Sequence, residues 1–139
     1  MKIIKEHIFN IIIGILCVVL VSTAWSAGSE FIRYMKGYAY DEEDFLSCIR
    51  IEDYSSMVEY LYKNEVNDVK TTAGMEECYA VARYYEAASM YKAYKAVGRN
   101  AEAEAEEKKQ MMEGQITEMG ELAYVAEDIV AYLELEMTE

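Results

Sequence analysis

The sequence predicts an all-α chain in which an N-terminal transmembrane helix precedes a small domain built as an antiparallel helical hairpin or bundle. Three observations predict it. The stretch Ile8–Ala27 is apolar and uncharged, the chain has no proline, and apolar residues beyond Met112 recur at alternating steps of four and three. Such steps are typical of helices that pack along a seam, and the composition favours helices with short connections.

Ile8–Ala27 is long enough to cross a bilayer, since roughly 20 helical residues at about 1.5 Å each span about 30 Å. A secretory signal peptide is the alternative, with Lys2 and Lys5 as its basic start and small residues near Ala24 as its cleavage site. We favour the anchor because an amphipathic pattern continues past the apolar stretch. The expected organisation is an anchor at 1–27, in contact with membrane lipid through residues 8–27, a juxtamembrane segment at 28–40 and an acidic helical domain at 41–139.

The orientation of this anchor rests on the short basic N-terminal tail. Basic residues flank both ends of the apolar stretch, two at the start and Arg33 and Lys36 after it, so their count alone does not decide the orientation. The tail resembles an ordinary export start. We therefore expect a single-pass cell-membrane protein with its C-terminal domain outside, and a secreted protein if the segment is cleaved.

The charge of the chain argues against nucleic acid as a partner. Once Met1–Ala27, which holds two Lys and one Glu, is set aside, 11 basic and 25 acidic residues remain, a formal charge of −14. A domain this acidic repels nucleic acid and anionic lipid. We expect a protein partner instead.

Local signals divide the first part of the domain. Asp41 is placed to cap a helix, and an apolar stripe at helical spacing runs from Phe45 to Tyr62, with Glu52-Asp53 able to divide it in two. Residues 64–74 are rich in Asn, Asp, Thr and Gly and predict a loop. A second helix is expected over residues 75–97.

Gly98 is the expected end of that helix and Asn100 the expected N-cap of the next. From residue 101 the regular seam predicts one continuous helix despite Gly114 and Gly120, and a break near Gly114 is the alternative. The seam over residues 112–137 needs cover. We expect the helices of residues 41–63 to supply it, with a homo-oligomer as another way to cover it.

The residues that usually carry chemistry are sparse. The only histidine is His7, so the domain can form no His-based triad or His-metal site. We expect no enzymatic activity, cofactor or metal; a carboxylate-dependent enzyme is the alternative. Cys48 and Cys78 could close a loop of about 30 residues as a disulfide. We favour two separate buried thiols.

Tyrosine is the most distinctive residue type, with 13 in the chain. Several share the predicted 75–97 helix with many alanines, a mixture that lets helices pack closely. Because tyrosine is also enriched at interfaces, part of this set is a candidate partner surface. The candidates are Tyr79, Tyr84, Tyr91 and Tyr94.

The segment from about residue 78 to 112 resembles the helical hairpin of a tetratricopeptide-like repeat. Tyr94, Gly98 and Ala103 match its aromatic, turn-glycine and small-residue positions, whereas Glu107 stands where a large apolar residue is expected. The resemblance implies a protein-interaction module. We therefore expect a membrane-anchored extracytoplasmic helical module or accessory subunit with no chemistry of its own.

Overall fold

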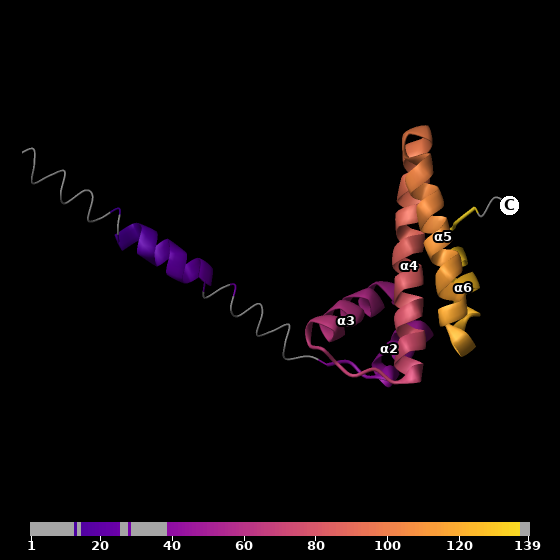
Figure 1. Cartoon of the computed structure of the whole chain (residues 1–139), viewed down its shortest axis with the longest axis horizontal. Coiled ribbons are helices and arrows are strands. Elements are labelled where there is room, and N and C mark those ends of the chain that lie inside the picture. Colours follow the sequence, from indigo (N-terminus) through magenta and orange to yellow (C-terminus); the bar gives the residue numbers. More distant parts are fainter. Residues whose placement is uncertain (1–12, 14, 26–27, 29–38, 137–139) are drawn as a thin grey trace, which may run out of the picture. The chain divides into compact units, whose positions relative to one another are not determined.

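The structure, a computed structural model, describes residues 13, 15–25, 28 and 39–136. The chain divides into two compact units, Met1–Gly37 and Tyr38–Glu139. The described residues form helices and no strands, which confirms the all-α fold class. Figure 1 shows the helices of the second unit.

In the first unit, residues 15–25 are helical. The large apolar side chains described there are all exposed, between 44% at Ile13 and 79% at Trp25. Among the described residues, no helix is both long and apolar enough to cross a membrane. The other residues of the predicted 8–27 span lie outside the described part, so the transmembrane helix stays a prediction.

The domain begins with two short helices, α2 (Glu42–Arg50) and α3 (Tyr54–Val66). Asp41 caps α2 as predicted, since its carboxylate accepts from the Asp44 N–H at 3.1 Å. Asp53 caps α3 by accepting from the Ser56 N–H at 3.2 Å, so the apolar stripe is divided at the predicted place. The loop is shorter than expected, because α3 continues to Val66 and the next helix begins at Ala73.

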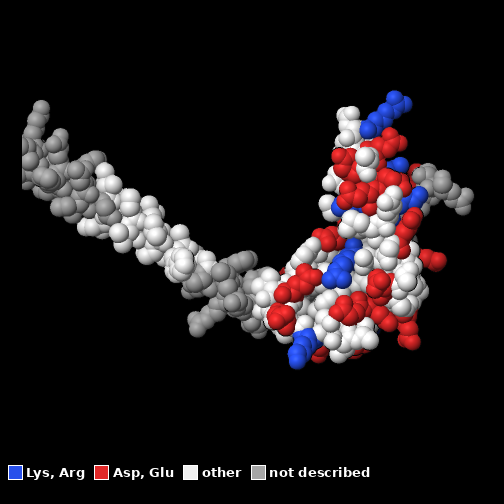
Figure 2. All heavy atoms as spheres, viewed as in Figure 1, with Lys and Arg blue, Asp and Glu red and all other residues white. Residues whose placement is uncertain are grey.

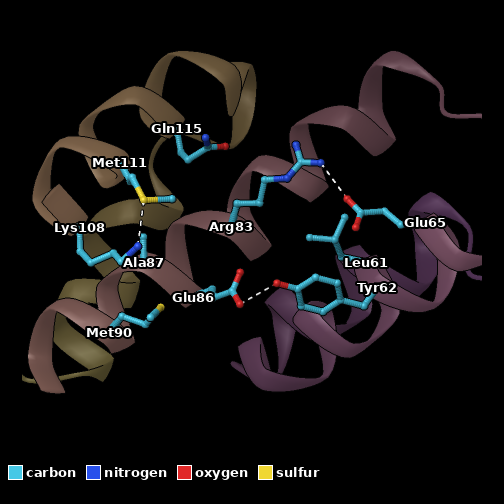
Figure 3. A pocket seen from close by; sticks show the side chains of 10 residues that line it. All are labelled: Leu61, Tyr62, Glu65, Arg83, Glu86, Ala87, Met90, Lys108, Met111 and Gln115. Atoms are coloured by element: carbon cyan, nitrogen blue, oxygen red, sulfur yellow. Dashed lines mark hydrogen bonds and ion pairs between the residues drawn. The ribbon is translucent and has the colours of Figure 1, made fainter. Parts of the chain in front are cut away.

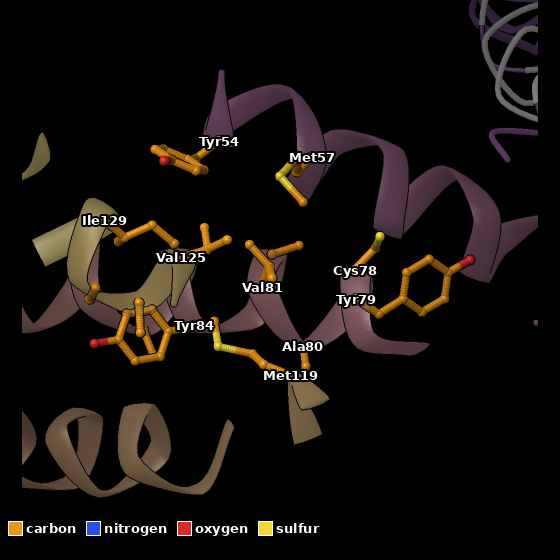
Figure 4. Packing of buried hydrophobic residues seen from close by; sticks show 14 of the residues in the cluster. Tyr54, Met57, Cys78, Tyr79, Ala80, Val81, Tyr84, Met119, Val125 and Ile129 are labelled. Atoms are coloured by element: carbon orange, nitrogen blue, oxygen red, sulfur yellow. The ribbon is translucent and has the colours of Figure 1, made fainter. Parts of the chain in front are cut away.

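The 25-residue helix α4 (Ala73–Val97) is the centre of the domain and confirms the predicted 75–97 helix. It packs against α2, α3 and the helices that follow, with α3 on one side of it in Figure 1 and α5 and α6 on the other. Because it is covered on several sides, its buried residues do not form a single stripe. In Figure 4 side chains from α3 and α6 converge around Val81 of α4.

The hairpin after α4 turns at Gly98, whose φ of 81° suits glycine. A short 3-10 helix, η1 (Gly98–Ala101), leads into α5 (Glu102–Glu118), which packs along α4. The predicted Asn100 cap is wrong. Asn100 lies inside η1, and Ala101 precedes α5 without a side-chain capping bond.

The predicted continuous helix after residue 101 is also wrong, and so is the alternative break at Gly114, which stays inside α5. The chain breaks at Gly120, through the 3-10 helix η2 (Gly120–Leu122), before α6 (Val125–Tyr132). Gly120 has a φ of 53°, and a Cβ there would clash with the Glu77 carboxylate. The turn brings α6 onto α4, where Val125 and Ile129 are fully buried.

Residues of α3 hold the start of the domain. The Asn64 side chain is buried, accepts from the Tyr40 N–H at 2.8 Å and donates to the Tyr40 carbonyl at 2.7 Å. The Tyr40 ring stacks on Tyr60 with centroids 3.7 Å apart. Lys63, also buried, pairs with Glu59 and lies over the Tyr40 ring. These contacts hold Tyr40, at the start of the domain, against α3.

Candidate binding groove

Three helices of the domain enclose a groove of about 370 Å³, which we call the α3–α5 groove (Figure 3). Its volume lies in the range of ligand-binding clefts. The lining comes from α3, α4 and α5, and consists of Leu61, Tyr62, Glu65, Arg83, Glu86, Ala87, Met90, Lys108, Met111 and Gln115.

Helical spacing explains why these residues meet. On α4 the lining residues follow steps of three, one and three from Arg83 to Met90, and on α5 steps of three and four from Lys108 to Gln115. Residues at such steps share one face of a helix. Each helix therefore presents one mixed apolar and polar face to the groove, and the buried Leu61 contributes to its floor.

Two polar contacts hold α3 to α4 across one side of the groove. The Tyr62 hydroxyl donates to Glu86 Oε1 at 2.7 Å, and Arg83 Nη2 lies 3.1 Å from Glu65 Oε1 (Figure 3). The hydrogen bond to Glu86, followed by burial, raises the pKa of Tyr62. Arg83 and Glu65 are each almost half exposed, so this pair contributes little to stability. Its effect is to set the directions of the two side chains.

Two methionines form the opposite side. Met90 is 38% exposed and Met111 is 47% exposed. Lys108 has a side chain only 16% exposed, and its Nζ lies 3.4 Å from the Met111 sulfur and 3.3 Å from Glu107. Methionine side chains adapt to irregular partners because they are unbranched and polarisable.

The groove also contains a polar atom without a partner. Gln115 Oε1 is buried and accepts no hydrogen bond from the described part of the chain. A buried acceptor left unpaired carries a desolvation penalty.

Acidic side chains predominate over basic ones on the face of the domain that Figure 2 shows. Arg83 and Lys108 are therefore local exceptions on a chain of net charge −13. Among the described residues, no group of three or more His, Cys, Asp or Glu side chains could hold a metal ion.

The tyrosines predicted as a partner surface lie mainly in the core. Tyr79, Tyr84 and Tyr91 are each less than 5% exposed, and only Tyr94 is partly exposed. Their burial corrects the expectation, because α4 is covered on the sides that carry them. They pack between helices, the other interpretation of the same pattern.

Cys48 and Cys78 are both buried free thiols. Burial, and then the nearby Asp53, raises the pKa of Cys48. Burial raises the pKa of Cys78 to about 12. Both thiols therefore stay protonated and unreactive in the folded domain.

The seam over residues 112–137 is divided between the core and the surface. Met112, Met119 and Ala126 are buried, whereas Ile116 is 40% exposed and Val130 is partly exposed. The helices of residues 41–63 supply only part of the expected cover, through the ring contact between Tyr54 and Tyr132. Most of the cover comes from α4.

No protein-family model, curated protein or solved structure matches the chain. The site residues predicted from the sequence do not include Tyr62, Arg83, Met90 or Met111. Their helical spacing was visible in the sequence, but the meeting of three separate helix faces was not.

Proposed function

We propose that the chain is a membrane-anchored, extracytoplasmic helical module that binds a partner protein, or acts as an accessory subunit of one, without chemistry of its own. The α3–α5 groove carries this proposal. It combines an apolar floor with Tyr62, Arg83 and two exposed methionines. Tyrosine, arginine and methionine are enriched at protein interfaces, and tyrosine and arginine among their energetic hot spots.

The contacts in the groove support a peptide segment as its occupant. An apolar side chain placed between Met90 and Met111 would cover both exposed thioethers. If the Gln115 amide rotates into the groove, its unpaired Oε1 could accept from a backbone N–H of that segment. The resemblance of residues 78–112 to a tetratricopeptide-like hairpin is in keeping with this role.

The exposed apolar side chains of residues 13–25 support the membrane anchor. Water is an unfavourable environment for a helix that exposes such residues throughout, whereas a bilayer covers them. The basic tail with Lys2 and Lys5 supports an inside N-terminus and an outside domain. If the segment is cleaved, the same domain is secreted.

Met111→Glu tests the groove. It replaces an apolar wall with a carboxylate beside Lys108, so the affinity of the detergent-purified full chain for a bound partner should fall at least about tenfold. Ala93→Glu is the matched control, because it adds the same charge at an exposed position of α4 outside the groove. Equal retention of the partner by both variants, or equal loss from both, would contradict the proposal.

Labelling in intact cells tests the location. In a cysteine-free chain, Glu104→Cys places one thiol at an exposed position of α5, where a membrane-impermeant maleimide should react with it without lysis. Labelling only after lysis would show that the domain lies inside. The intact mass of the mature chain then separates an uncleaved anchor from a processed, secreted form.

A further inference from the structure

A second groove lies between α4, α5 and α6. It has a volume of about 430 Å³, and we call it the α6 groove. Tyr84 is buried at its floor and Ile116 is 40% exposed at its wall. It is lined by Tyr84, Ile116, Ala126, Glu127, Val130, Ala131, Glu134 and Leu135.

The charged side chains that line the α6 groove all have one sign. Residues 110–136 contain seven acidic residues and no Lys, Arg or His, and all seven are exposed. Two of them, Glu127 and Glu134, line the groove. Within the described part of the chain, none of the seven takes part in an ion pair.

Glu134 lies at the C-terminal end of α6 and has a φ of 52°, a conformation that favours glycine. Its N–H donates to the Ala131 carbonyl at 3.0 Å, and the Leu135 N–H donates to the Val130 carbonyl at 3.0 Å. These two bonds form a Schellman motif, which turns Leu135 back toward the groove. The same turn holds the Glu134 carboxylate at the lining.

We propose that the α6 groove binds a cationic amphipathic helix of a partner protein. Apolar side chains of that helix would contact Ile116, Val130 and Leu135, and its Lys or Arg side chains would lie beside Glu127 and Glu134. A second copy of this chain fits less well, because it would bring the same seven acidic residues to the contact. The surface is separate from the α3–α5 groove, so the inference does not depend on the function proposed there.

The test uses the full chain in dodecyl maltoside micelles and a fluorescent 18-residue helix with leucine on one face and lysine on the other. Fluorescence anisotropy, corrected with empty micelles, should show saturable binding that weakens as salt is raised. A peptide of the same pattern with glutamate in place of lysine should bind at least tenfold more weakly. Equal binding of the two peptides would overturn the proposal.

Charge-matched variants locate the site. Glu134→Gly and Asp68→Gly each remove one carboxylate from a helix C-terminus at which φ is 52° or 51°. Both should raise the unfolding temperature, so loss of the fold cannot account for weaker binding. Glu134→Gly should weaken binding of the lysine peptide about fivefold, and Asp68→Gly should leave it unchanged. Equal weakening by the two would show only a general effect of net charge and would overturn the proposal.

Apolar variants complete the test. Ile116→Gln should weaken binding of the lysine peptide about tenfold, whereas Val97→Gln, at an exposed position of α4 outside the groove, should not. Unchanged binding by Ile116→Gln would overturn the proposal. Sedimentation equilibrium of the chain without peptide provides the last check. A dimer that Ile116→Gln dissociates would assign the groove to a second copy and likewise overturn it.

Discussion

Replacing Glu52 with glycine should stabilise the domain. Glu52 follows α2 with a φ of 57°; its N–H donates to the Ile49 carbonyl at 3.1 Å, and the Asp53 N–H donates to the Cys48 carbonyl at 2.9 Å. A left-handed conformation costs a residue other than glycine about 1–2 kcal/mol. Against this, glycine loses about 0.4–1 kcal/mol more conformational entropy on folding. The net expectation is a gain of about 1 kcal/mol in the free energy of unfolding.

Thermal unfolding of the full chain in detergent, followed by circular dichroism, measures this gain. For a domain of this size a change of about 1 kcal/mol corresponds to a shift of roughly 4–8 °C. Glu52→Gln is the control, because it removes the carboxylate at the negative end of the α2 dipole but keeps the strained backbone. This control should raise the free energy of unfolding by only a few tenths of a kcal/mol. If Glu52→Gly is no more stable than Glu52→Gln, backbone strain is not the cause.

Three further predictions concern buried polar groups. Asn64→Ala should lower the free energy of unfolding by about 1–3 kcal/mol, measured in urea, because it removes both hydrogen bonds to the Tyr40 backbone; an unchanged midpoint would contradict this. Burial raises the pKa of Tyr54 from 10.0 to about 12, so the contribution of its neutral form to the free energy of unfolding is complete below pH 10 and is lost as the pH rises toward 12. Tyr54→Phe should therefore reduce the dependence of the free energy of unfolding on pH between 10 and 12. An unaltered pH dependence would contradict this. Cys48 and Cys78 should react with maleimide at pH 8 only in denaturant, and modification of the native domain would show that α2 or α4 opens.

The parts of the fold that depend on local signals were predictable. A carboxylate before a helix accepts from its first free N–H groups whatever the rest of the chain does, and Asp41 behaves in this way. Gly98 ends α4 because glycine reaches positive φ without strain. Asn100 failed as a cap because the chain enters α5 through a 3-10 turn, an alternative that the sequence does not distinguish.

The partner surface was harder to predict, because exposure depends on what covers each helix face. Tyr84 and Tyr62 belong to the same residue type and both lie in helices, yet Tyr84 is 3% exposed and Tyr62 is 45% exposed. The difference arises from their neighbours, since Tyr84 lies on α4 at the centre of the domain, whereas Tyr62 lines the open α3–α5 groove. No local pattern around either tyrosine carries that information.

The break at Gly120 exchanges helical hydrogen bonds for the burial of apolar side chains. A continuous helix from 101 to 136 would be about 54 Å long, against about 38 Å for α4, and its last turns would pass the end of α4. The break instead buries Val125 and Ile129 completely, which contributes about 1.5–3 kcal/mol for each side chain. Several backbone bonds are re-formed in the turn, including Leu122 N–H to the Met119 carbonyl at 2.9 Å. The turn thus combines complete burial of two apolar side chains with backbone bonds that replace part of the helical set.

The same break produces the α6 groove. In a continuous helix, Ile116 and Val130 would lie about 21 Å apart along the axis, since 14 residues separate them at about 1.5 Å each. In the folded domain the two residues line one groove, because the turn at Gly120 folds α6 against α4 next to α5. The seam thus supplies core residues from one part of its pattern and a binding surface from the other. A pattern that predicts one continuous helix therefore contains both the core residues and the groove-lining residues, and the position of the turn decides which residues belong to each set.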